Sequence, residues 1–217
     1  MKLDSNKITE TAIGVSKEIF SAFPKSGLSN LSRELVRYSK DVSILSKKIS
    51  APNWPLRISI FVICGLMLII PFFAIKLIFY KVELTTSVSD FMQGFDALVN
   101  EIVFIGIGIY FLSSIETRIK RKKVLKILHE LRSMAHVIDA RQLTKNSLMF
   151  REGGADLSVA QYLKHCTELL SIISSIAAIS VQNFSDHISV DAVNDVESLC
   201  NGLSRKIWQK IAILEKL

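Results

Sequence analysis

The chain has 217 residues, 49% of them hydrophobic, and a mean hydropathy of +0.35, which is high for a soluble protein. The net charge of +7 would suit a nucleic-acid-binding protein, but the distribution of the charge argues against one. The segment before residue 58 has ten Lys and Arg against five Asp and Glu, and the segment from residue 116 has fifteen against eleven. The connection 81–96 has one Lys against three acids. This asymmetry predicts a membrane hairpin with both termini in the cytoplasm and a short outer loop.

Residues 1–53 are predicted to form a cytoplasmic helical hairpin. The first helix, 6–23, is amphipathic and ends at Pro24 and Gly27. The second carries an apolar seam that either packs within the chain or forms an intermolecular coiled coil. The seam consists of Leu28, Leu31, Leu35, Tyr38, Val42, Leu45 and Ile49.

Residues 54–117 are predicted to form the transmembrane hairpin. Its two apolar runs, 58–80 and 97–115, each meet the requirement of roughly 20 residues for a spanning helix if semi-polar residues are allowed at their ends. Trp54 suits the cytoplasmic interface at the start of the first span, and Pro71 predicts a kink within it.

Two sets of polar or small residues lie within the predicted spans. Lys76 and Glu101 fall at a similar depth near the outer surface, where they either form an ion pair or reach the interface separately. A stripe on the second span favours either close helix packing or a polar pore lining. This stripe is Gly106, Tyr110, Ser113 and Thr117.

A basic cluster follows the second span without an intervening Gly or Pro. Such a cluster is typical of a span that ends at the anionic headgroups of a cytoplasmic lipid surface. Its members are Arg118, Lys120, Arg121, Lys122 and Lys123.

Beyond the cluster the same helix is predicted to continue to about Ala140, with a second apolar seam that stops at Ile138 because Gln142 is polar. His129, Ser133 and His136 share another face, which is either an anion or metal site or a solvated surface. Two histidines do not make a metal site, so we predict no bound metal or cofactor. The seam comprises Val124, Leu128, Leu131, Ala135 and Ile138.

Residues 144–156 are predicted to be a loop, and two further amphipathic helices reach the C-terminus. The apolar stretch 169–181 has only 13 residues, so it indicates a buried core helix rather than a third span. Residues 118–217 therefore form a cytoplasmic helical domain. The predicted fold is all-α: a two-helix membrane hairpin with a cytoplasmic helical bundle.

Two passages of the cytoplasmic part resemble an uncharacterised group of bacterial two-span membrane proteins. They are AHVID at 135–139 with QLTK at 142–145, and GLSRKIWQK at 202–210. The resemblance implies a bacterial inner membrane and carries no assigned activity or site.

The sequence contains no P-loop, GxSxG, HExxH or GxGxxG motif, so we predict that the protein is not an enzyme. One hypothesis is an oligomeric effector or channel-like protein, including a role in bacterial defence. Its cytoplasmic helices would couple a ligand or partner to the spans. Several copies are needed, because two spans cannot enclose a pore. The alternative is a membrane anchor or adaptor that recruits a soluble protein. A third hypothesis is an enzyme that acts at the cytoplasmic surface and uses His129 or His136.

Overall fold

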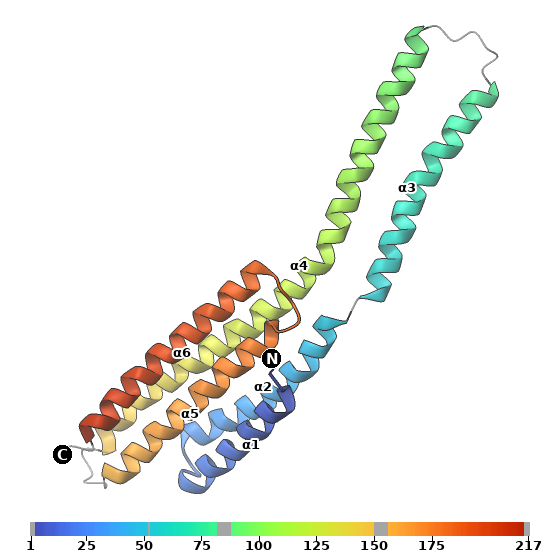
Figure 1. Ribbon diagram of the computed structural model, residues 1–217. Coiled ribbons are helices and arrows are strands. Elements are labelled where there is room, and N and C mark those ends of the chain that lie inside the picture. Colours follow the sequence, from blue (N-terminus) through green and yellow to red (C-terminus); the bar gives the residue numbers. More distant parts are fainter. Residues whose placement is uncertain (1–2, 52, 82–87, 150–155, 215–217) are drawn as a thin grey trace. The chain divides into compact units, whose positions relative to one another are not determined.

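The computed structural model describes residues 3–51, 53–81, 88–149 and 156–214 (Figure 1). These residues form six helices and no strand, which confirms the all-α fold. In chain order the helices are α1 (Ser5–Ala22), α2 (Gly27–Ser50), α3 (Trp54–Lys81), α4 (Val88–Met149), α5 (Asp156–Val181) and α6 (His187–Leu214).

The chain divides into two compact units. The bundle unit comprises Met1–Ala51 and Arg121–Leu217, and the hairpin unit comprises Pro52–Lys120. Helix α4 contributes residues to both units, because the boundary falls between Lys120 and Arg121 within it.

Side-chain caps explain where three helices of the bundle unit begin. The Asp4 carboxylate accepts the backbone N–H of Asn6 at the start of α1, and the Ser26 hydroxyl accepts that of Ser29 at the start of α2. Asp186 does the same for Ser189 at the start of α6. Each cap satisfies a backbone donor that has no partner within its own helix.

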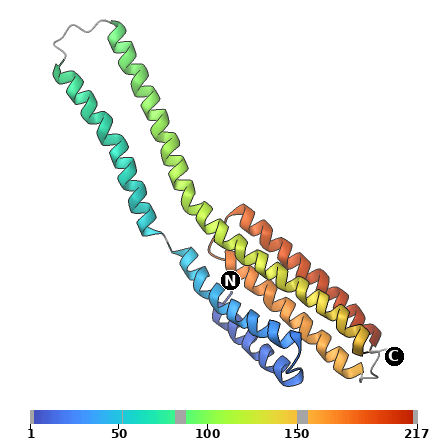
Figure 2. The ribbon, with the colours of Figure 1, turned by 180° about the vertical axis from the view of Figure 1, so that it is seen from behind.

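Helix α5 lies at the centre of the bundle unit. It contacts α1, α2 and α6, and both ribbon views show it between the other helices of the unit (Figures 1 and 2). Leu163, Leu170 and Ile173 are fully buried, so the apolar character of α5 reflects a core position. The prediction that 169–181 is a core helix rather than a third span is confirmed.

Both predicted apolar seams are buried inside this one core. The α2 seam buries Leu28, Leu35 and Ile49, and the α4 seam buries Leu131 and Ile138. The intramolecular interpretation of the α2 seam is therefore the correct one. Because the seams are filled by side chains of the same chain, they are not available to join two copies.

Paired hydroxyl groups line the contact between α1 and α2. Ser5 and Ser43 lie 3.0 Å apart, Thr9 and Ser39 lie 2.8 Å apart, and Ser16 and Ser32 lie 3.0 Å apart, each measured between the side-chain oxygens. These small side chains let the two helices approach closely while their polar atoms satisfy one another. The last of these pairs is buried.

Three predictions about α4 were wrong in detail. The helix begins at Val88 rather than at the start of the apolar run 97–115, and it ends at Met149 rather than near Ala140, so the predicted loop 144–156 starts too early. The seam also continues past Ile138, because Gln142 is only 1% exposed and its amide donates to the Asp139 carboxylate. Hydropathy marks where a helix is apolar, whereas the end of a helix depends on its backbone hydrogen bonds, so the apolar pattern alone does not locate that end. Residues 150–155 of the predicted loop lie outside the described residues.

The hairpin unit consists of α3 and the part of α4 up to Lys120, and its apolar side chains face outward. The side chains of Phe61 and Phe104 are 78% and 72% exposed, and other large apolar residues of both helices are also exposed. Helix α3 runs through Pro71 to Lys81. Among the described residues, one helix is long and apolar enough to cross a membrane. It lies within Val99–Gln142, and its most apolar window is not buried.

Replacement of Leu35 by Ala should destabilise the bundle unit, because the cavity left in the core removes packing as well as buried apolar area. We expect a loss of about 2–5 kcal/mol in the free energy of unfolding. Chemical denaturation of the full chain in detergent measures it, with Ile44→Ala, an exposed position on the same helix, as the control. A loss for Leu35→Ala no larger than that for Ile44→Ala would contradict the position of Leu35 in the core.

Candidate functional site

Lys76 and Glu101 both lie on the exposed surface of the hairpin unit. No ion pair joins these two side chains among the contacts of the described residues. In water an exposed pair gains little, whereas in lipid each charge would need a partner or access to the interface. A Lys76–Glu101 pair in the bilayer therefore stays a prediction.

The stripe predicted for packing or pore lining points outward from the hairpin unit. Gly106, Tyr110 and Thr117 are exposed, and a Cβ atom at Gly106 would meet nothing within 4 Å. The close approach of α3 falls at Gly108, where a Cβ atom would lie 3.6 Å from the Met67 sulfur. Two residues apart on a helix lie on nearly opposite faces, so the Gly106 face is turned away from α3. The side chain of Ser113 lies outside the described part.

Two of the five residues in the predicted lipid-surface cluster bind carboxylates of the protein. The Lys120 ammonium lies 2.8 Å from Glu116, and the Arg121 guanidinium lies 2.6 Å from Asp186. The cluster is therefore less available to lipid than the sequence predicted, because two of its cations already form ion pairs with acidic residues of the chain. The Arg118 guanidinium lies over the Phe111 ring, at 5.6 Å from its centroid. Lys122 and Lys123 are exposed.

Glu116 joins the start of α3 to α4 within the hairpin unit. Its carboxylate accepts from Arg57 Nε at 3.1 Å, from Lys120 Nζ at 2.8 Å and from the backbone N–H of Asn53 at 3.4 Å. Asn53 immediately precedes α3, so this carboxylate ties the first turn of one helix to the other. The i,i+4 spacing of Glu116 and Lys120 was visible in the sequence, whereas the contact with Arg57 depends on the antiparallel arrangement.

Arg121 and Asp186 form the best-organised ion pair of the bundle unit. Two guanidinium nitrogens donate to the two carboxylate oxygens, at 2.9 and 2.6 Å. The Asp186 side chain is only 7% exposed, and it also accepts from the backbone N–H and the hydroxyl of Ser189. These hydrogen bonds, that of Arg121 first, lower the pKa of Asp186 below its ordinary value. One carboxylate thus both caps α6 and holds it to α4.

His129, Ser133 and His136 all lie on the exposed surface of α4, as helical spacing predicts for one face. The opposite side of the same segment carries the buried seam. An anion or metal site at these three residues stays a prediction.

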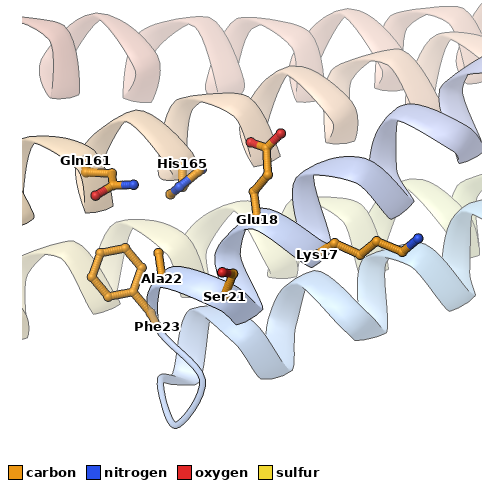
Figure 3. A pocket seen from close by; sticks show the side chains of 7 residues that line it. All are labelled: Lys17, Glu18, Ser21, Ala22, Phe23, Gln161 and His165. Atoms are coloured by element: carbon orange, nitrogen blue, oxygen red, sulfur yellow. The ribbon is translucent and has the colours of Figure 1, made fainter.

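An open groove of about 750 Å³ lies between α1 and α5 in the bundle unit. Figure 3 shows Glu18 reaching from α1 toward α5, close to His165, while Lys17 points away from that histidine. The sequence alone does not indicate this site, because positions 18 and 165 share no local pattern. The lining residues are Lys17, Glu18, Ser21, Ala22, Phe23, Gln161 and His165.

Comparison of the chain with protein-family models, curated proteins and solved structures found no match.

Replacement of Asp186 by Asn should reduce the dependence of stability on acid pH. Because the folded state lowers the pKa of Asp186, this carboxylate stabilises the protein above its ordinary pKa of 3.8, and the contribution is lost as the pH falls through the lowered value. Between about pH 5 and about pH 3, the unfolding temperature should therefore decrease less for D186N than for the parent protein.

Asp195→Asn is the matched control. The Arg132–Asp195 pair also joins α4 to α6, but both of its side chains are exposed to solvent. If the unfolding temperature depended on pH equally in D186N and D195N, the role assigned to Asp186 would be contradicted.

Proposed function

We propose that the protein is an integral membrane protein, with the hairpin unit in the bilayer as two spanning helices and the bundle unit in the cytoplasm. The observation that carries this proposal is the outward-facing apolar surface of the hairpin unit, on α3 as well as on α4. Exposed apolar surface of this extent needs a cover, and lipid is the cover that suits helices of this length. With 28 residues, α3 exceeds the roughly 20 that a span requires.

The number of spans determines on which side of the membrane the N-terminus lies. With both helices inserted, the N-terminus is cytoplasmic; with α4 alone inserted, the N-terminus lies outside, because the basic residues after the span keep the C-terminal part inside. We expect an N-terminal tag to be protected from protease in intact spheroplasts and cleaved after lysis. Cleavage in intact spheroplasts, with a C-terminal tag still protected, would contradict two spans.

The proposed activity is to couple the bundle to the spans. Helix α4 carries core residues of the bundle unit, among them Leu131, and exposed apolar residues of the hairpin unit, among them Phe104. A ligand or partner that binds one arrangement of the bundle more tightly than another would shift the population of arrangements of this shared helix. In an effector or channel-like protein, such a shift would rearrange the spans and so change the permeability of the membrane.

A channel-like activity requires several copies, and the filled seams of the bundle leave the hairpin unit as the surface for assembly. The outward face of Gly106 suits this role, because small residues let helices pack closely in a membrane. We therefore propose a homo-oligomer held by contacts between spans.

Replacement of Gly106 by Leu should dissociate the oligomer without disturbing the single chain, because the space beside Gly106 is open. Light scattering of the purified protein in detergent measures the mass of the complex. We expect a multiple of 24.3 kDa for the parent protein and a monomer for G106L. Gly14→Leu is the control, since the space beside Gly14 in the bundle unit is equally open. A monomeric parent protein would contradict the oligomer.

The alternative function is that of a membrane anchor or adaptor, in which the spans only tether the bundle and the bundle recruits a soluble protein. The burial of both seams within one chain favours it, because the bundle then needs no second copy to complete its core. A monomeric chain that retains one stoichiometric soluble partner would support this alternative, as would function that survives replacement of both spans.

A further inference from the structure

We propose that Glu18, His165 and Glu168 bind a divalent transition-metal ion of the Zn²⁺ class, which links α1 to α5. One imidazole nitrogen and one oxygen from each carboxylate lie within 4.8 Å of one another. The site lies wholly within the bundle unit, so it does not depend on the proposed insertion of the hairpin unit in a membrane.

The geometry requires only small side-chain movements to close around an ion. Ligand atoms at about 2.0–2.2 Å from a tetrahedral zinc are about 3.4 Å apart. The His165 Nδ1 atom is already 2.8 Å from the Glu168 Oε2 atom, so these two would separate slightly. Glu18 is exposed and reaches toward α5 from the other helix, so its carboxylate can rotate into place (Figure 3).

The two ligands on α5 are held in position before any ion binds. His165 and Glu168 are three residues apart and therefore share a face of the helix. The His165 side chain is only 7% exposed, and the Phe23 ring packs against the imidazole edge-to-face at 6.3 Å. An aromatic contact and burial together restrict the orientation of the imidazole, which lowers the entropy lost on binding an ion.

The donor set selects the class of metal. One nitrogen and two carboxylate oxygens match the mixed ligands that zinc accepts, whereas Ca²⁺ requires six to eight oxygens and Mg²⁺ usually retains several waters. Three protein ligands beside an open groove leave the fourth position to water or to a group of a bound molecule. Two carboxylates also offset the charge of a divalent ion.

Zinc binding to the full chain in detergent, after removal of metal with a chelator, tests the proposal. We expect calorimetry to show one Zn²⁺ per chain, and Zn²⁺ to raise the unfolding temperature, because an ion that binds only the folded state stabilises it. Glu18→Gln should weaken the affinity by at least about tenfold, since even loss of an outer-shell partner costs 10–100-fold. Glu18 is exposed, so this replacement does not threaten the fold.

Glu10→Gln is the matched control: the same change at another exposed glutamate of α1, outside the groove. We expect its zinc affinity to equal that of the parent protein. Zinc held instead by exposed histidines, such as His187 beside Asp191, would leave the affinity of E18Q unchanged. That result, or the absence of binding by the parent protein at micromolar Zn²⁺, would overturn the proposal.

Discussion

Water cannot surround the apolar side chains of the hairpin unit without a large cost in free energy, and this constraint distinguishes the two units of the chain. Burial of one large apolar side chain is worth about 1.5–3 kcal/mol, and exposed residues of this kind are distributed along both α3 and α4. In the bundle unit the equivalent residues are buried against one another. The bundle therefore completes its own core, whereas the hairpin unit needs a lipid or protein cover.

Helical periodicity predicted the helices of the bundle unit and the buried faces of α2 and α4, because the spacing of apolar residues along a helix encodes the face that packs. The helices of the hairpin unit were predicted from the length of two apolar runs. It could not predict that α5 lies at the centre, since that depends on contacts between distant segments. The ends of α4 were wrong for a related reason. Gln142 is buried although it is polar, which no hydropathy pattern reveals. Its amide nitrogen donates to the Asp139 carboxylate, whereas its carbonyl oxygen has no hydrogen-bond partner among the described residues. The local sequence therefore determines which face of a helix is buried, and the tertiary fold determines which other helices pack against that face.

The candidate sites show the same limit. Glu116 and Lys120 are four residues apart and readable in the sequence, but Arg121 finds its partner 65 residues away at Asp186. The basic cluster, which the sequence predicts to bind lipid, thus also supplies Arg121 to join α4 to α6. Likewise, His165 and Glu168 form a local pair, and only the packing of α1 on α5 adds Glu18 to them.

We propose that the hairpin unit lies in lipid and the bundle unit does not, and the two tryptophans of the chain test this placement directly. Trp54 begins α3 and Trp208 lies on α6, and both side chains are exposed. In liposomes containing brominated lipid, which quenches tryptophan only at short range, the Trp208→Phe variant reports Trp54 and the Trp54→Phe variant reports Trp208. We expect strong quenching of Trp54 and no quenching of Trp208. Quenching of neither tryptophan, or of both equally, would contradict it.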